Sequence, residues 1–183
     1  MTRNNFLNIL DENSAKRVSQ LDEFWQAYES MYVPILELNT PMRKAFFLAQ
    51  VAHESHAFRT TEEYASGAAY EGRKDLGNIN NGDGRKFKGR GDIQLTGRAN
   101  YTTFTKWLRN RLGDTPDFAE NPELVSERPW ATWATIYFWE SRDLNKFADK
   151  GFFKALTKRI NGGFRGYNDR LKYFNKFYPE LID

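Results

Sequence analysis

One helix that is apolar on almost every side constrains the fold of this chain more than any other feature. Thr40 and Pro41 give it an N-cap residue followed by proline, which helices accept at their first position. It ends near His53 or Glu54. Its apolar residues are Ala45, Phe46, Phe47, Leu48, Ala49, Val51 and Ala52. Because a helix that is apolar all round has to be covered all round, we expect it to be the central buried helix.

Apolar residues at three- and four-residue steps predict further helices around this one. The clearest runs from about Ser14 to Tyr32 and carries Val18, Leu21, Phe24, Trp25, Tyr28 and Met31. The same spacing predicts helices at about 100–112, 129–140 and 168–177, and one or two shorter helices within 144–160. Strand patterns are scarce, and the best place for a small hairpin lies between Arg85 and Thr96. The sequence therefore predicts a mainly α fold.

Between Ala65 and Arg90 the chain has the composition of a loop. This stretch holds the glycines Gly67, Gly72, Gly77, Gly82, Gly84 and Gly89, with several Asn and Asp residues among them. A loop of this length inside a compact domain is more often functional than not. We therefore expect this segment to have a function.

Charge and composition narrow the classes of partner. The formal net charge is +3 and the isoelectric point is about 9.0, which suits approach to an anionic polymer such as peptidoglycan, lipopolysaccharide or nucleic acid. The chain contains no cysteine, which excludes disulfides and thiolate metal sites. No run reaches the ~20 apolar residues of a membrane span, and the start of the chain lacks the apolar core of a signal peptide. We therefore expect no stable membrane insertion and a cytoplasmic location in the producing cell.

Glu54 is the strongest candidate for a catalytic residue, because it ends the apolar helix. A glycosidic bond is cut by two carboxyl groups, one of which has to be held protonated near neutral pH in a partly apolar setting. The boundary between core and surface at Glu54 could provide that setting. A glutamate at a helix end can also be solvated or paired with Arg or Lys, and position alone leaves these readings open.

A second carboxyl group would have to come from Glu62, Glu63 or Glu71, the acids that follow in the chain. Nine residues of continuous helix turn through ~900°, so Glu54 and Glu63 would point in opposite directions on one helix. They can face a common cleft only if the chain turns within residues 55–58, Ser-His-Ala-Phe, which contain neither glycine nor proline.

Other chemistries fit the residues less well. His53 and His56 are the only histidines and lie three residues apart instead of four, which argues against a zinc site, and we expect no metal. The chain has no G-x-S-x-G nucleophile motif. The basic segment from Gly84 to Gly91 lacks the Gly-Lys-Ser/Thr of a phosphate-binding loop. This segment could bind nucleic acid, but the basic run is short, and we expect no nucleic-acid partner.

Four separated motifs resemble glycoside hydrolase family 19, which contains chitinases and bacteriophage endolysins. They are residues 46–55 followed by Phe58 and Glu63, residues 88–101, residues 159–163 and residues 168–174, and the match spans about 41–178 in the same order. The resemblance implies a single catalytic domain over residues 1–183, with a helical segment at about 1–39 and a motif-bearing core at about 40–178. The implied fold is mainly α, lysozyme-like and two-lobed, with a small β-hairpin and a central cleft bordered by the glycine-rich loop.

The resemblance also implies catalytic roles. Glu54 matches the general acid, and Glu63 matches the general base of the short-loop bacterial members. Glu71 is the alternative base, and we expect Glu62 to be a solvated neighbour. Thr96 matches a hydroxyl that helps to hold the attacking water. The family inverts the anomeric centre, which requires room for a water between the carboxyl groups, and it uses no metal or cofactor.

Further matched residues are implied to bind the substrate or to orient the carboxylates. The three polar ones are Gln94, Asn100 and Asn161. Arg170 matches a buried arginine near the catalytic pair. The sequence departs from the family at residues 55–57, where Ser-His-Ala replaces the glycines that usually follow His-Glu. The turn that the mechanism requires is therefore made without glycine.

The resemblance leaves two polymers open, because chitin and peptidoglycan both contain β-1,4-linked N-acetylated sugars. The compact basic chain, without cysteine, secretion signal or chitin-binding module, favours peptidoglycan, and residues 65–73 look more like phage lysins. We expect a monomeric endolysin with lysozyme activity that builds up in the host cytoplasm and reaches the wall once the inner membrane is opened. The alternatives are a chitinase and, in another class, a non-catalytic module that binds cell wall or nucleic acid.

Overall fold

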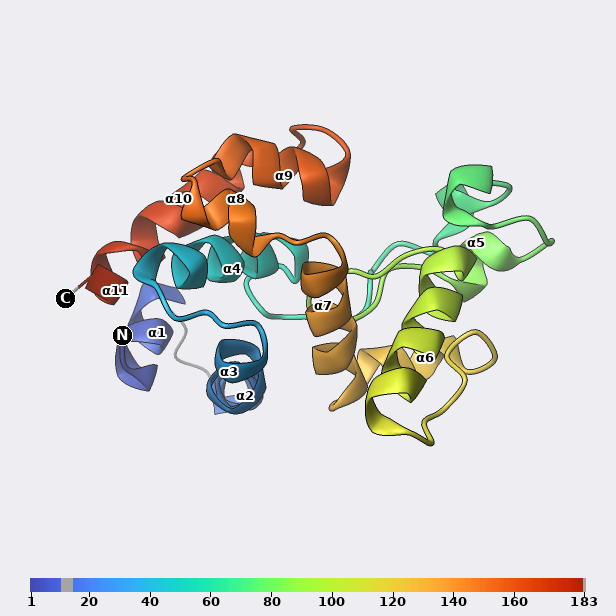
Figure 1. Ribbon diagram of the computed structural model, residues 1–183, viewed down its shortest axis with the longest axis horizontal. Coiled ribbons are helices and arrows are strands. Elements are labelled where there is room, and N and C mark those ends of the chain that lie inside the picture. The colour runs from blue at the N-terminus through green and yellow to red at the C-terminus, as the bar shows by residue number, and fades with distance from the viewer. Residues whose placement is uncertain (11–14, 183) are drawn as a thin grey trace. The chain divides into compact units, whose positions relative to one another are not determined.

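The computed structural model describes residues 1–10 and 15–182, and these residues are mostly helical (Figure 1). The chain divides into two compact units, one made of Met1–Arg59 with Trp139–Asp183 and the other of Thr60–Phe138. Strand pairing within the described residues is limited to isolated β-bridges. The predicted mainly α class is confirmed, and the two units agree with the expected two lobes.

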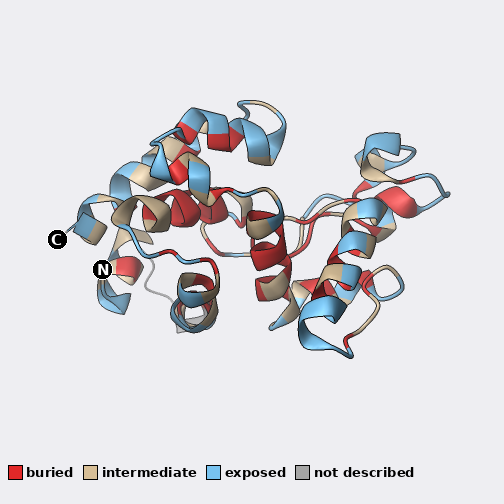
Figure 2. Cartoon of the chain, in the orientation of Figure 1, coloured by how far each residue is buried: buried red, intermediate tan, exposed pale blue. Residues whose placement is uncertain are grey.

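The first unit is built around the apolar helix, α4 (Pro41–Glu54). Every residue from Ala45 to Ala52 is buried, as the red central turns of α4 show in Figure 2. The backbone N–H of Arg43 donates to the Thr40 side chain at 3.1 Å, so the predicted N-cap is confirmed. Three helices pack against α4, namely α8 (Asn145–Asp149), α10 (Tyr167–Phe177) and α11 (Pro179–Ile182). The expected central buried helix is therefore present.

Aromatic packing joins the N-terminal helices of this unit to the residues that follow α4. The unit begins with α1 (Arg3–Leu10) and α2 (Ala15–Ala27). The Phe6 ring of α1 lies 5.9 Å from Phe24 and 5.2 Å from Phe58, and the Phe24 and Phe58 rings lie 4.2 Å apart. Because all three side chains are buried, they fix the chain just beyond Glu54 against both N-terminal helices.

The predicted helix from Ser14 to Tyr32 is divided in the structure. Ser14 lies outside the described residues, and α2 is described from Ala15. Residues Tyr28–Tyr32 wind as a π-helix before α3 (Val33–Ile35), and the N–H of Val33 donates to the carbonyl of Tyr28. Pro34 follows and has no N–H for a regular α-helical bond, which accounts for the change of winding at this point.

The second unit contains the glycine-rich loop and two longer helices. Its elements are 3₁₀ turns at Ala68–Tyr70 and Lys74–Leu76, α5 (Asp83–Lys86), α6 (Arg98–Leu112), a 3₁₀ turn at Pro122–Ser126, and α7 (Trp130–Ser141), whose last residues belong to the first unit. Tyr101, Phe104 and Phe118 form much of its buried core. The helix expected within 144–160 appears as α8 and α9 (Phe153–Asn161) of the first unit.

The loop and the hairpin are both present, the hairpin in a reduced form. Arg90 and Leu95 exchange two backbone hydrogen bonds of 3.1 and 2.7 Å, and this one bridge is all that forms within the predicted hairpin. The loop folds back on itself at Gly67, where its backbone lies close to that of Gly84. Only glycine fits there, because a Cβ at this position would lie 2.4 Å from the Gly84 carbonyl oxygen. Among the described residues, no helix has the length and apolar character needed to cross a bilayer.

Candidate active site

The chain makes a sharp left-handed turn directly after Glu54. Helix α4 ends at Glu54, and the next three residues after Ser55 all have positive φ: His56 at 52°, Ala57 at 59° and Phe58 at 62°. Residues with a Cβ rarely adopt this conformation, and each such residue costs ~1–2 kcal/mol. The turn that the sequence analysis required between Glu54 and Glu63 is therefore present, without glycine.

Two side chains hold this turn in place. The Ser55 hydroxyl donates to the Val51 carbonyl at 2.6 Å and accepts the N–H of Phe58 at 3.0 Å. Arg17, buried on α2, donates to the carbonyl of Phe58 at 2.7 Å and to the carbonyl of Ala57. The strained conformation is thus fixed by buried hydrogen bonds from both ends.

Arg170 on α10 binds the carboxylate of Glu54. Its Nη2 donates to Glu54 Oε1 at 2.5 Å, and its Nη1 donates to Gln50 Oε1 at 2.6 Å. Gln50 in turn donates to the Thr157 hydroxyl at 3.2 Å. The Arg170 side chain is 1% exposed and that of Glu54 is 19% exposed, so a buried cation holds a carboxylate that reaches the surface. Within the described residues Oε2 of Glu54 makes no hydrogen bond, and it can contact a ligand.

A second contact between α4 and the segment around α10 lies beside Glu54. His53 Nδ1 lies 2.7 Å from Asp169 Oδ2. Gly166 leaves room for this histidine, since a Cβ there would lie 2.2 Å from the His53 ring. Asn161, the last residue of α9, is exposed and donates to the Arg165 carbonyl at 3.5 Å. The structure therefore brings Arg170 to Glu54, while the hydrogen bond of Asn161 belongs to the turn after α9.

Glu63 lies in the second unit, in a polar setting built by the loop. The Tyr70 hydroxyl donates to Glu63 Oε1 at 2.9 Å, and the N–H of Gly89 donates to Oε2 at 3.1 Å. Lys88 donates to the Glu63 carbonyl at 3.1 Å, and the N–H of Glu63 donates to the Gly89 carbonyl at 2.9 Å. Both carboxylate oxygens of Glu63 are thereby oriented, and the segments 63–70 and 88–89 are tied together.

Three of the predicted site residues adjoin Glu63 through this strip of chain. A Cβ at Gly89 would lie 2.6 Å from Gln94 Oε1 and 3.3 Å from Glu63 Oε2, so both side chains pass over this glycine. The Thr96 hydroxyl donates to the Gln94 carbonyl at 2.9 Å, and Asn100 Nδ2 donates to the Thr96 carbonyl at 2.6 Å. Gln94 has a φ of 59°, another strained non-glycine residue. The second unit thus gathers Glu63, Gln94, Thr96 and Asn100.

The two other glutamates considered as the second carboxyl group, Glu62 and Glu71, have structural partners. Glu71 accepts the N–H of Gly82 at 2.7 Å and the N–H of Gly84 at 2.8 Å, so its carboxylate braces the loop. Glu62 was expected to be a solvated neighbour, and its side chain is 41% exposed, but it also has basic partners. Its carboxylate accepts Arg90 Nε at 2.9 Å and lies 3.4 Å from Lys88 Nζ, because the bridge between Glu62 and Arg90 aligns the two side chains.

Sequence reasoning missed several residues that the structure connects to the candidate acids. They are Arg17, Gln50, Tyr70, Thr157 and Asp169. Gln50 and Asp169 lie within the matched motifs and Tyr70 lies within residues 65–73, and this could have singled them out. Arg17 lies outside the motifs, and no local pattern marks it. Among residues 1–10 and 15–182, no group of three or more His, Cys, Asp or Glu side chains is placed to hold a metal ion.

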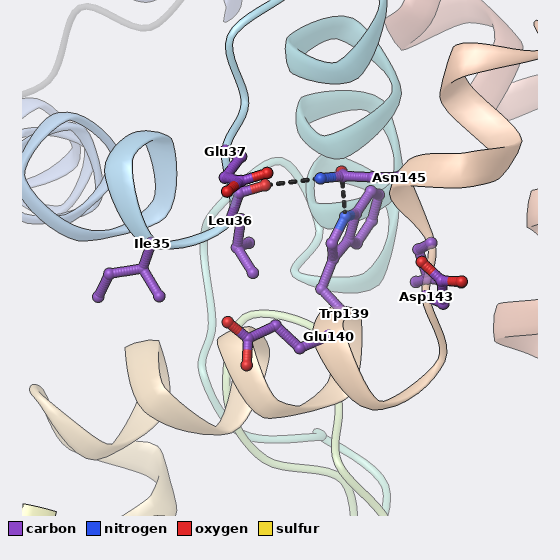
Figure 3. Close-up of a pocket in the computed structure, with 8 residues that line it drawn as sticks. Ile35, Leu36, Glu37, Trp139, Glu140, Asp143 and Asn145 are labelled. Carbon is purple, nitrogen blue, oxygen red and sulfur yellow. Dashed lines mark hydrogen bonds between the residues drawn. The ribbon is translucent and has the colours of Figure 1, made fainter. Parts of the chain in front are cut away.

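Figure 3 shows a pocket of about 240 Å³ in the first unit that none of the predicted site residues lines. Trp139 Nε1 donates to Asn145 Oδ1 at 2.9 Å, and Asn145 Nδ2 donates to the Leu36 carbonyl at 2.6 Å. These bonds join α7 to the segment after α3. The Trp139 side chain is almost fully buried, so the ring belongs to the core and offers no exposed face for stacking on a sugar.

Comparison with known proteins links the chain to a family. A Haemophilus influenzae protein described as a glycosyl hydrolase family 19 domain-containing protein is 30% identical over 164 residues, covering 73% of this chain and 77% of the relative. An endochitinase of Arabidopsis thaliana is 32% identical over 126 residues, covering 65% of this chain and 39% of the plant protein. No protein-family model matches the chain.

Solved structures agree at the level of the fold. Chitinase C from Streptomyces griseus has a TM-score of 0.67 at 19% identity, covering 99% of this chain and 76% of that protein. A bacterial family 19 chitinase gives a TM-score of 0.68 at 18% identity, covering 98% and 94%. A class IV chitinase from Zea mays gives 0.64 at 18% identity, covering 97% and 90%. Identities this low show a common fold alone.

Proposed function

The chain belongs to glycoside hydrolase family 19, and on this premise we propose that it cuts the glycan strands of bacterial peptidoglycan. It is a chitinase-like glycoside hydrolase by family, and the peptidoglycan substrate and the role as a lytic enzyme are our proposal. The observation that carries the proposed chemistry is the environment of Glu54. Its carboxylate emerges from the end of a buried helix, with Oε1 held by Arg170 and Oε2 unbonded within the described residues.

In the proposed reaction Glu54 is the general acid. Oε2 gives its proton to the glycosidic oxygen as the bond from that oxygen to the anomeric carbon breaks. Arg170 and the turn at residues 56–58 hold the carboxyl group in one orientation, which is the contribution a rigid scaffold makes to proton transfer. The leaving sugar departs as an alcohol, and Glu54 is left as a carboxylate.

Glu63 is the proposed general base. It removes a proton from the water whose oxygen bonds to the anomeric carbon on the face opposite the leaving group, which inverts the configuration. Tyr70 and Gly89 each donate to one carboxylate oxygen, and every such oxygen keeps a further lone pair for the proton of the water. The Thr96 hydroxyl uses its own proton on the Gln94 carbonyl, so toward a water it can only accept. Glu54 then takes up a proton from solvent and Glu63 releases the one it took from the water, which restores the enzyme.

Several features support peptidoglycan over chitin. The chain carries a net charge of +3, and the stem peptides of peptidoglycan carry carboxylates where chitin is neutral. Residues 65–73 resemble phage lysins, and they include Tyr70, which bonds to Glu63. We further propose that the enzyme acts as a monomer, without a metal or cofactor, on wall material reached from the host cytoplasm. A chitinase is the second candidate, because the curated plant relative and the solved structures are described as chitinases.

The decisive experiment compares wild type, Glu54→Gln and Glu23→Gln. Turbidity clearing of permeabilised Gram-negative cells and release of oligomers from chitin are measured side by side. We expect wild type to clear cells, Glu54→Gln to lose nearly all clearing with an unchanged fold, and Glu23→Gln, which alters an exposed glutamate of α2, to act as wild type. Release of oligomers from chitin with walls left intact would establish the chitinase instead. Normal clearing by Glu54→Gln would end the assignment of the acid.

A further inference from the structure

The solvent face of α9 and the turn after it carry a cluster of basic residues. Lys154, Lys158 and Arg159 are exposed on α9, and Arg165 is exposed in the turn that follows. Residues 150–165 contain five basic residues and no acidic one, a local charge larger than the net +3 of the entire chain. This part of the first unit is therefore strongly basic. We call these four side chains the α9 basic surface.

The charge of this surface is not cancelled by neighbouring acids. None of its four cations forms an ion pair with another residue in the part of the chain that the structure describes, and the acids nearest in sequence are already committed. Asp149 binds Arg43 at 2.6 Å, and Asp169 lies 2.7 Å from His53. The field of the α9 basic surface is therefore available to a ligand.

An exposed aromatic ring and a predicted sugar-binding residue lie within the same surface. The Phe164 ring is half-exposed, and the Nζ atoms of Lys154 and Lys158 lie 5.0 and 6.0 Å from its centroid. Contacts of ammonium groups with a ring restrict where the groups can point. Asn161 ends α9 and donates to the Arg165 carbonyl at 3.5 Å. The cations therefore lie directly beside the residue that is expected to contact a sugar.

We propose that the α9 basic surface binds the carboxylates of the stem peptides of peptidoglycan and thereby selects this anionic glycan over neutral chitin. The inference rests on the proposed function, because it takes Asn161 as part of the same substrate site. Lys and Arg pair with carboxylates through charge-assisted hydrogen bonds. A polymer of N-acetylglucosamine has no charge for these side chains to pair with, so the surface distinguishes the two polymers.

The packing of α9 argues for a polymer and against a lipid bilayer as the ligand. A helix that binds a membrane surface inserts an apolar face among the lipids. The apolar face of α9 is already used, because Phe153, Leu156 and Thr157 are buried in the first unit. The exposed face of α9 carries the cations, Ala155 and Asn161, and two partly exposed rings flank the helix, Phe152 at 55% and Phe164 at 49%. This mainly polar face has the composition expected for contact with a hydrated anionic chain.

The test is co-sedimentation with purified Gram-negative sacculi in a Glu54→Gln background, where binding is measured without hydrolysis. Replacing all four residues of the α9 basic surface with Gln should weaken binding about tenfold at low ionic strength and remove most of its salt dependence. A matched variant, Lys106→Gln/Arg111→Gln/Lys146→Gln/Lys176→Gln, loses the same charge from other exposed positions and should bind like its parent. Thermal unfolding of both variants checks that each is folded.

Undiminished binding by the α9 variant, or an equal loss in the matched variant, overturns the inference. Sacculi whose carboxylates have been amidated should bind parent and α9 variant equally weakly. Stronger α9-dependent binding to phosphatidylglycerol vesicles or to duplex DNA than to sacculi would also overturn it. Hydrolysis by the wild-type protein is scored separately. Binding that depends on α9 without cleavage of any glycan would end the proposed function alone, and cleavage of sacculi with α9-independent binding would end this inference alone.

Discussion

The guanidinium of Arg170 donates to two acceptors at once. Replacing it with lysine tests whether its positive charge alone is sufficient or whether its geometry is also required. Nη2 binds Glu54 and Nη1 binds Gln50, both within 2.6 Å. Lysine keeps the positive charge but lacks the planar fork that reaches both oxygens. We expect Arg170→Lys to lower kcat by about tenfold or more and to lower stability by ~1–3 kcal/mol, because the buried Gln50 oxygen loses its donor.

Kinetics on sacculi and urea unfolding check this prediction. Arg85→Lys, the same exchange at an exposed position, is the control and should change neither quantity. A kcat equal to that of wild type in Arg170→Lys would show that the orientation of Glu54 does not depend on the two-pronged contact.

Matched substitutions can show which of Glu63 and Glu71 is the general base. Glu63→Gln should lower kcat by ~10²–10⁴-fold, the usual contribution of a general acid–base group. Glu71→Gln should leave kcat close to wild type and lower stability by about 1 kcal/mol, because Glu71 accepts the N–H groups of Gly82 and Gly84. Steady-state rates and thermal unfolding of both variants are the measurements. The reverse pattern would transfer the role of base to Glu71.

At this scale the sequence could predict the residues whose position or motif marks them. The end of an apolar helix singled out Glu54, and motif similarity placed Arg170 near the acid, where the structure has it. The pairing of His53 with Asp169 joins residues 116 positions apart. Such a contact exists only after helices have packed, and no periodicity or local spacing contains it. The catalytic roles themselves stay predictions.

Among the elements, the left-handed turn at residues 56–58 has the most direct consequence for stability. Ala57 has a φ of 59° and is held there by Arg17 and by its own N–H, which donates to the Ala52 carbonyl at 2.6 Å. Glycine adopts this φ without the Cβ clash, although it loses more entropy on folding. We expect Ala57→Gly to stabilise the protein by about 0.5–1 kcal/mol.

A matched substitution in a regular helix should have the opposite sign. Ala155 is exposed inside α9, where glycine is unfavourable by ~1 kcal/mol. Ala155→Gly should therefore destabilise the protein while Ala57→Gly stabilises it, as measured by urea unfolding of both variants. A loss of stability in both would mean that the turn is less strained than its backbone angles indicate.

Substitution of two glycines in the first unit distinguishes the cost of backbone strain from the cost of a steric clash. Gly162 and Gly166 have φ of 74° and 71°, yet a Cβ at Gly162 would meet nothing within 4 Å, while one at Gly166 would lie 2.2 Å from the His53 ring. Gly162→Ala should cost about 1 kcal/mol from conformation alone.

Gly166→Ala should cost clearly more stability than Gly162→Ala and should also reduce activity, because His53 precedes Glu54. Thermal unfolding and clearing assays are the readouts. Equal effects of the two substitutions on both quantities would contradict the role assigned to Gly166 as space for His53.

At the scale of elements, apolar periodicity was sufficient where a helix has strong local signals. The helix predicted from Thr40-Pro41 to His53 or Glu54 agrees with α4 at both ends, since the N-cap and the apolar run are local. The hairpin within 85–96 is reduced to one bridge, because Arg90 pairs with Glu62 as well as with Leu95 and the chain bends at Gly91 and Gln94. Glu62 is too far from Arg90 in the sequence for a local pattern of alternating apolar residues to predict their pairing.

The stability of the whole molecule should fall at acidic pH, because its ion pairs lose their negative charge there. Each unit contains an aspartate whose pKa lies below its ordinary value of 3.8 because an arginine donates to it: Asp149 with Arg43 in the first unit and Asp83 with Arg98 in the second. A carboxyl group with a lowered pKa in the folded state stabilises that state fully above its unfolded pKa. The stabilisation is lost as the pH falls below about 4 and through the folded pKa.

Thermal unfolding at pH 7 and at pH 3 should therefore separate these pairs from other surface charges. Asp83→Asn and Asp149→Asn should each lower the midpoint at pH 7 and have a smaller effect at pH 3, where the wild-type carboxylate is already being protonated. Asp83 is buried and Asp149 is partly exposed, so solvent screening should make Asp83→Asn the larger of the two. Asp114→Asn, at an exposed position without an ion pair in the described residues, should be neutral at both pH values. Equal losses at pH 7 and pH 3 would show that the aspartates act through packing and hydrogen bonding alone, independent of their charge.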